Sequence, residues 1–156
     1  MTEITYQPIT SETADTLRKG GPDAYGNPAE RAVSDGGGNP CRCCLSEVPK
    51  GAGMLIFAHR PFSDTQPYAE TGPIFLCADD CTPWDGAGVP PILTNSPDYL
   101  VKAYTADERI KYGTGQITDA GDVPAYAAGL LDQPDIAFVD VRSARNNCYQ
   151  LRITRA

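Results

Sequence analysis

The sequence predicts an α+β fold with a mainly antiparallel sheet, one clear helix in the C-terminal half, and long Gly/Pro-rich loops. Three observations predict it. Residues 123–131 carry the clearest helical apolar period, several short segments alternate apolar and polar side chains, and 15 glycines with 14 prolines supply many turns. Strand runs with few helices favour antiparallel pairing over the regular strand–helix alternation of a parallel sheet.

The N-terminal part contains one predicted strand and one predicted helix. Residues 2–9 favour a short edge strand. Thr10 or Ser11 then caps a weak helix that runs to about Lys19, because hydroxyl side chains satisfy free N–H groups at a helix start. Glycines and a proline end that helix, and residues 20–40 form a long Gly/Pro/Asn-rich loop.

The middle of the chain predicts two strand pairs. Met54–His59 and Pro73–Ala78 form a hairpin with a long loop, and a turn-rich segment follows at residues 79–97. Tyr99–Thr105 and Arg109–Tyr112 form the second pair, joined across residues 106–108.

The C-terminal part predicts a helix followed by a hairpin. The helix over 123–131 places Val123, Tyr126, Ala127, Leu130 and Leu131 on one stripe, after Asp122 as N-cap and with Pro124 in its first turn. Two strands close the chain, at about 135–142 and 148–154. Their apolar faces, which pack on this helix, carry Ala137, Val139 and Val141 on one strand and Tyr149, Leu151 and Ile153 on the other.

Composition and charge restrict the class of protein. The chain predicts a single domain over residues 1–156, and its composition excludes collagen, coiled coil and wholesale disorder. No apolar run reaches the roughly 18 residues of a membrane helix, and the first residues lack the pattern of a secretory signal, so we expect a soluble cytoplasmic protein. The net charge is −7, and residues 61–101 contain six carboxylates without a lysine or arginine. We therefore expect no nucleic-acid partner and no membrane partner.

Four of the six cysteines form two closely spaced pairs. Cys41 and Cys44 follow a Gly/Pro turn, and Cys77 and Cys81 lie at the end of a predicted strand, with 32 residues between the pairs. Two chelating thiol pairs at the ends of loops are what a tetrahedral zinc site requires. The sequence therefore indicates zinc as the candidate cofactor.

Three other interpretations of the cysteines stay open. Some can be buried core residues, Cys77 above all, because it alternates with apolar neighbours. A disulfide from Cys44 to Cys81 would hold the same loops together. A redox pair at Cys41 and Cys44 is the third, although the residues that follow begin a helix poorly. His59, the single histidine, is interpreted as a hydrogen-bonded structural residue, with two alternatives: a base for a nucleophilic cysteine, or a metal ligand in place of one of the four cysteines.

The C-terminal hairpin predicts a second candidate site. The face opposite the apolar one carries Asp140, Arg142, Cys148 and Arg152. Two guanidiniums there would bind a carboxylate or a phosphate, so the expected partner is a small anionic ligand, or else a protein. The alternative is a solvated sheet face with an Asp–Arg cross-strand pair.

Several segments resemble the bacterial domain-of-unknown-function family 1203, over residues 38–156. They are PCRCCL, GxxMLIFAHRPF, PYAETGPIFLCADDC, KAY…RI and VDVRSARNNCYQLRITR. The resemblance implies a bacterial cytosolic protein and no particular activity. Members of that family often have histidine at the position of Cys77, which is also a zinc ligand, while others lack counterparts of Cys44 and Cys81. Such a site would then be structural.

No hydrolase or nucleotide-binding signature is present. The sequence therefore favours a small binding or structural module with a loop-tying cysteine cluster. The alternative is an enzyme of thiol chemistry, either a redox pair or a Cys–His59 pair.

Overall fold

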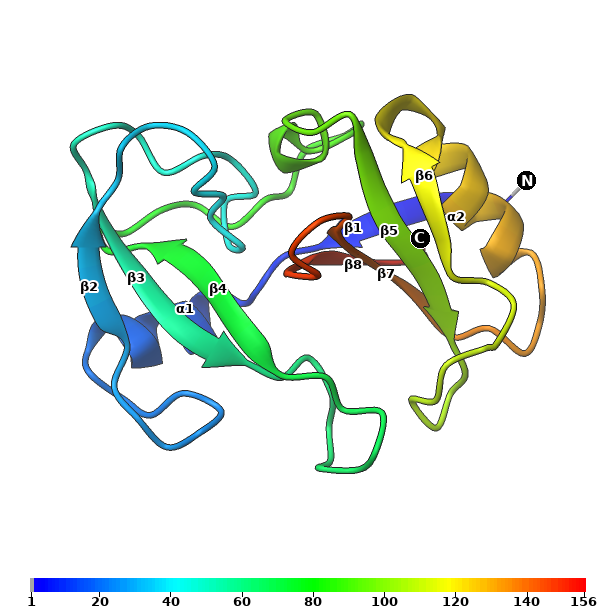
Figure 1. The fold of residues 1–156 in the computed structure, drawn as a ribbon, viewed down its shortest axis with the longest axis horizontal. Coiled ribbons are helices and arrows are strands. Elements are labelled where there is room, and N and C mark those ends of the chain that lie inside the picture. Colours follow the sequence, from blue (N-terminus) through cyan, green and yellow to red (C-terminus); the bar gives the residue numbers. More distant parts are fainter. Residues whose placement is uncertain (1) are drawn as a thin grey trace.

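The structure, a computed structural model, describes residues 2–156 and contains two antiparallel sheets that lie side by side (Figure 1). The helices, α1 and α2, are short, and none among the described residues reaches the length and hydropathy of a membrane span. The elements in chain order are β1 (Ile4–Gln7), α1 (Ser11–Arg18), β2 (Glu30–Val33), β3 (Gly53–His59), β4 (Gly72–Cys77), η1 (Pro91–Leu93), β5 (Asp98–Tyr104), β6 (Gln116–Asp119), η2 (Ala120–Asp122), α2 (Val123–Leu131), β7 (Phe138–Ser143) and β8 (Tyr149–Arg155).

The larger sheet has five strands in the order β1-β8-β7-β5-β6, and α2 packs against it. Val139, Val141, Leu151 and Ile153 share one buried cluster with the apolar stripe of α2, as the alternation predicts. The predicted helix matches α2 residue for residue, although the Asp122 side chain makes no capping hydrogen bond. The α+β class and the C-terminal helix are therefore confirmed.

The smaller sheet has the order β2-β3-β4 and packs against α1. Its β3–β4 hairpin pairs Met54 with Cys77 at one end and His59 with Gly72 at the other, which confirms the predicted hairpin. The helix α1 begins as predicted, because the Thr10 hydroxyl accepts a hydrogen bond of 3.2 Å from the Thr13 N–H.

Two short edge strands differ from the sequence prediction. The strand β2 lies within the segment 20–40 that predicts a loop, and its side chains are mostly exposed. The strand β6 pairs with β5, whereas the predicted strand Arg109–Tyr112 is wrong, since Ile110 makes only an isolated bridge to Tyr104. Edge strands of four residues bury too few side chains to show an alternating pattern.

A β-bulge changes which face of β8 carries Tyr149. The register shifts between Val141 and Arg142, so Tyr149 pairs with Arg142 instead of continuing the apolar face of Leu151. The prediction that Tyr149 shares that face is wrong, because its ring packs in the core of the smaller sheet. The polar face of β7 and β8 turns toward the smaller sheet and is buried, so it is not a solvated face.

Candidate metal centre and inter-sheet site

The cysteine cluster forms where a loop runs beside the last residues of β4. Arg42 N–H donates to Phe75 O at 3.1 Å, and Cys41 and Phe75 form a parallel bridge. Cys77 ends β4, and its N–H donates to the Cys41 sulfur at 3.3 Å. The sheet thus brings the first thiol pair against the second, although 32 residues separate the pairs in the sequence.

The four predicted ligands, Cys41, Cys44, Cys77 and Cys81, come together. Their Sγ atoms all lie within 4.8 Å of one another, and those of Cys41 and Cys81 are 3.8 Å apart. A tetrahedron with Zn–S bonds of about 2.3 Å has sulfur–sulfur edges of about 3.8 Å, whereas a disulfide requires about 2.05 Å. All six cysteines are free thiols in the structure, so the cluster has dimensions compatible with a metal site.

Arg18, which ends α1, is a neighbour of the cluster that sequence reasoning missed. Its Nε donates to Cys77 O at 3.1 Å and its Nη2 donates to the Cys81 sulfur at 3.2 Å. A cationic donor stabilises negative charge on a sulfur. No local pattern indicates this contact, because 63 residues separate the partners.

Proximity of the thiols moves their pKa values in opposite directions. Hydrogen bonds from Cys44 and Cys77 lower the pKa of Cys41 to about 6, and hydrogen bonds from its neighbours also lower that of Cys81. The same interactions raise the pKa values of Cys44 and Cys77. The bare cluster therefore favours a mixture of thiols and thiolates, and a bound divalent cation would allow all four to ionise.

The second candidate site lies between the two sheets. Asp140 and Arg152 face each other on β7 and β8 and form the predicted cross-strand pair, with Nε–Oδ1 and Nη2–Oδ2 distances of 2.8 and 3.1 Å. Asp140 is fully buried, and Arg152 also donates to Pro61 O at 2.6 Å and stacks on the Phe138 ring. This guanidinium is thus largely occupied by partners within the chain.

Arg142 has fewer partners. Its Nη1 donates to Asn147 O at 3.0 Å, and its Nη2 lies 2.8 Å from Glu70 Oε2 without the alignment of a hydrogen bond. The Nε atom is buried and has no hydrogen-bond partner among residues 2–156. Glu70 Oε1 accepts hydrogen bonds from Lys102 and Tyr104 while Oε2 faces Arg142, so one carboxylate pairs with both Lys102 and Arg142.

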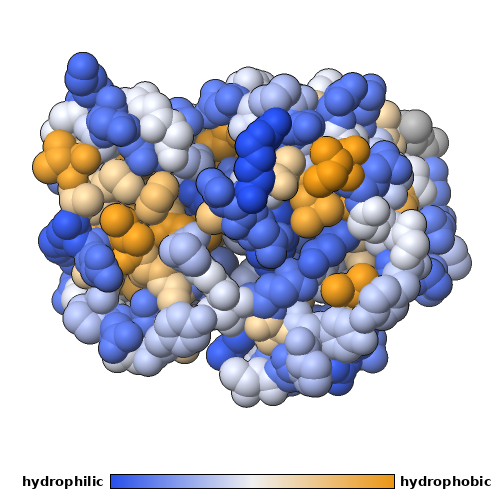
Figure 2. All heavy atoms as spheres, viewed as in Figure 1, coloured by the Kyte–Doolittle hydropathy of each residue, from blue (hydrophilic) through white to orange (hydrophobic). Residues whose placement is uncertain are grey.

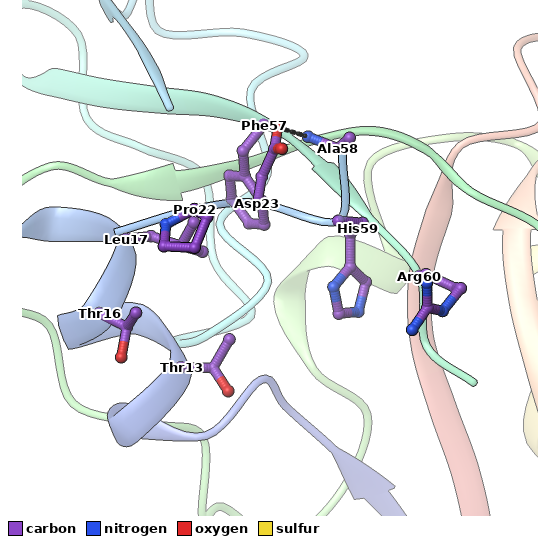
Figure 3. Close-up of a pocket in the computed structure, with 10 residues that line it drawn as sticks. Thr13, Thr16, Leu17, Pro22, Asp23, Phe57, Ala58, His59 and Arg60 are labelled. Atoms are coloured by element: carbon purple, nitrogen blue, oxygen red, sulfur yellow. Dashed lines mark hydrogen bonds between the residues drawn. The ribbon is translucent and has the colours of Figure 1, made fainter. Parts of the chain in front are cut away.

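His59 ends β3 and borders three cavities, one of which is shown in Figure 3. Burial and the charges of Arg42, Arg152 and Arg142 lower the pKa of the imidazole to about 4, so the ring is neutral at pH 7. Within residues 2–156 the imidazole makes no hydrogen bond, contrary to the structural interpretation. It lies beside Tyr149, with ring centroids 5.4 Å apart.

His59 is remote from the cysteine cluster but close to a different thiol. Along β3 it lies five residues from Met54, the partner of Cys77, which corresponds to about 17 Å of strand. Cys148, however, lines the same cavity of about 350 Å³ as His59 and Arg142. Figure 2 shows a hollow between the two sheets whose rim is mainly hydrophilic.

Fold and site together define a small α+β protein with a four-cysteine cluster and a polar cavity between two sheets. The chain belongs to the family described as "Protein of unknown function (DUF1203)", whose model matches residues 38–155. That range includes both cysteine pairs and the inter-sheet residues but excludes β1 and α1, and so Arg18. No curated protein and no solved structure matches the chain.

Proposed function

We propose that the protein is a small binding module whose loops are held by a structural Zn²⁺ bound to Cys41, Cys44, Cys77 and Cys81. The observation that carries this proposal is that the four Sγ atoms lie within 4.8 Å of one another. Two of them come from the loop before β3, and two come from the end of β4 and the residues that follow it. Four thiolates form a closed tetrahedral shell without an open position, which is typical of structural and not of catalytic zinc. Soft sulfur ligands select zinc over magnesium or calcium.

The surroundings of the cluster support a metal that stabilises the loop. Leu45, directly after Cys44, has the left-handed φ of 56° and is fully buried in the core of the larger sheet. A non-glycine residue in this conformation is unfavourable by about 1–2 kcal/mol, so neighbouring interactions must hold it. Four thiolates and one Zn²⁺ leave a charge of about −2, which the Arg18 guanidinium partly offsets.

Native mass spectrometry of protein purified without chelator tests the metal. We expect an excess of about 63 Da, equal to Zn²⁺ less two protons, which disappears on acidification as the thiolates protonate. Cys44→Ser removes one ligand, so the excess should be lost and stability should fall by several kcal/mol. Cys43→Ala, a buried cysteine outside the four-ligand set, is the matched control and should retain the metal.

The same measurement distinguishes the other interpretations. A deficit of about 2 Da that reductant reverses would indicate a disulfide. An unshifted mass with six reactive thiols in the unfolded chain would contradict the metal proposal. Because thiols persist in reducing compartments, we place the protein in the bacterial cytoplasm.

We infer that the binding partner is a small anion, held in the region of Asp140, Arg142, Cys148 and Arg152. The support is a pair of guanidiniums between the sheets of an otherwise acidic protein, of which Arg142 is buried and Arg152 is half-buried. Nucleic acid and membranes do not suit the net charge of −7.

The second candidate function is thiol chemistry. It is favoured by one observation, namely that Cys148, neutral His59 and Arg142 line one cavity. A nucleophile, a base and an oxyanion partner are the groups that acyl transfer requires. Alkylation by iodoacetamide tests this second function. Rapid alkylation of native Cys148 well below pH 8 supports an enzyme of thiol chemistry, and alkylation only at the rate of an ordinary thiol contradicts it.

A further inference from the structure

Several buried or half-buried cations lie between the two sheets. Arg142 and Lys102 share Glu70, and Arg152 is paired with Asp140. Arg42 adds a further guanidinium, and its described polar contacts are two backbone carbonyls, Tyr149 O at 2.7 Å and Pro40 O at 2.6 Å. Two carboxylates, Glu70 and Asp140, thus make the direct ion pairs, while Glu47 and Glu108 line the adjoining cavities beside Arg42 and Arg152.

Two of these guanidiniums are buried, and a buried charge is costly unless its ionic and hydrogen-bonding partners are complete. Arg142 is 5% exposed and Arg42 is 2% exposed. Burial lowers the pKa of Arg42 to about 10, so the guanidinium stays charged at neutral pH. A buried charge without an ionic partner is unfavourable by several kcal/mol, and an anion that enters this space would remove part of that cost.

A cavity of suitable size adjoins this charge. Its volume is about 350 Å³, which is within the range of small-molecule sites, and residues of both sheets line it. His59 and Gly72 come from the smaller sheet, Glu70 precedes β4, and Arg142 and residues 146–149 come from β7, the turn after it and the start of β8. The turn that joins β7 and β8 reaches toward the smaller sheet in Figure 1.

The polar groups in its wall have unused hydrogen-bonding capacity. The Arg142 Nε is buried without a partner, and its Nη2 is not aligned with Glu70. Neutral His59 can donate one ring N–H, because its imidazole has no partner among the described residues. The Nε–Nη2 edge of a guanidinium suits two oxygens of one carboxylate or phosphate, so a ligand oxygen at Nη2 would displace the Glu70 carboxylate.

We propose that this cavity binds a small oxyanion, a carboxylate or a phosphate, with Arg142 as the main ligand-binding residue and His59 as a hydrogen-bond donor. The inference rests on the anionic partner proposed above and deepens it by placing the ligand. Arg152 is a supporting residue, since Asp140 already occupies its guanidinium. Glu70 competes with the ligand for Arg142.

This competition gives a test with two opposite outcomes. Calorimetric titration uses inorganic phosphate in one arm and acetate or succinate in the other, at constant ionic strength maintained with chloride. Arg142→Gln should weaken binding at least tenfold, because it removes a charge-assisted hydrogen bond. Glu70→Gln should strengthen binding by about tenfold, because it frees Arg142 and Lys102.

Arg145→Gln is the matched control. Arg145 lies in the β7–β8 turn but is 64% exposed and pairs with Asp98, so its loss should change affinity less than twofold. Binding of phosphate alone or of carboxylates alone supports the site and identifies the source of the oxyanion. Binding of neither, or equal weakening by Arg145→Gln and Arg142→Gln, overturns the proposal.

Two further measurements keep the test decisive. If Arg142→Gln does not fold, the gain in affinity of Glu70→Gln decides alone, and an unchanged affinity in that variant overturns the proposal. The zinc content of each sample is measured by native mass. A zinc-loaded protein that binds no oxyanion contradicts this inference and leaves the metal proposal intact.

Discussion

At the scale of single residues, His59 links protonation to stability. Its pKa is about 4 in the folded protein and 6.5 in the unfolded reference, because burial and the charges of Arg42, Arg152 and Arg142 disfavour the imidazolium. The unfolded state therefore takes up the proton first. The stability conferred by the neutral ring is complete above about pH 6.5 and is lost progressively as the pH falls toward 4.

We expect the free energy of unfolding to decrease by about 1.3 kcal/mol more in the wild type than in His59→Gln when the pH falls from 7.5 to 5.5. Urea unfolding at the two pH values measures this difference, and effects common to both proteins cancel. An equal decrease in the two proteins would show that His59 is not responsible.

The contacts among the candidate site residues could be predicted from the sequence more fully than the neighbours of these residues. The four clustered cysteines follow from their spacing, and the Asp140–Arg152 pair follows from strand alternation. Arg18 and Glu70 could not be predicted, because each reaches its partners across long stretches of chain without a local pattern. Tyr149 was misplaced because a bulge adds one residue to β8, and period-2 alternation contains no signal for it.

At the scale of elements, capping and apolar periodicity define the helices, and buried alternation defines the central strands. Pro124 and the apolar stripe determine where α2 lies in the sequence, and the Thr10 cap determines where α1 begins. The edge strands β2 and β6 could not be predicted, since Val33 and Ile117 are exposed there and packing contributes little to either strand.

The helix α1 also contacts the cysteine cluster, because Arg18 at its C-terminal end donates a hydrogen bond to the Cys81 sulfur. We expect Thr10→Ala to destabilise the protein by about 1 kcal/mol, as the Thr13 N–H loses its acceptor. Ser11→Ala is the control, since the Ser11 hydroxyl makes no described contact, and it should change stability by less than about 0.5 kcal/mol. Urea midpoints of the two variants provide the comparison, and equal midpoints would contradict this capping role.

At the scale of the whole molecule, each sheet, together with the loops beside it, contributes a side chain to the core of the other. Leu45, from the cysteine loop beside the smaller sheet, is buried in the core of the larger one. Tyr149, from the larger sheet, is buried in the core of the smaller one. This exchange means that neither core is complete without the other, and the cysteine cluster lies in the loop that carries Leu45.

We therefore expect residues 1–156 to unfold as one cooperative domain. Leu55→Ala in the smaller sheet and Leu151→Ala in the larger one are a matched pair, since both side chains are fully buried. Each should cost about 2–5 kcal/mol. Because the cores are shared, each should lower amide-exchange protection equally in β3 and in β7, with one transition in far-UV circular dichroism. If each variant loosened only its own sheet, the two sheets would unfold independently, and the single-domain prediction would be wrong.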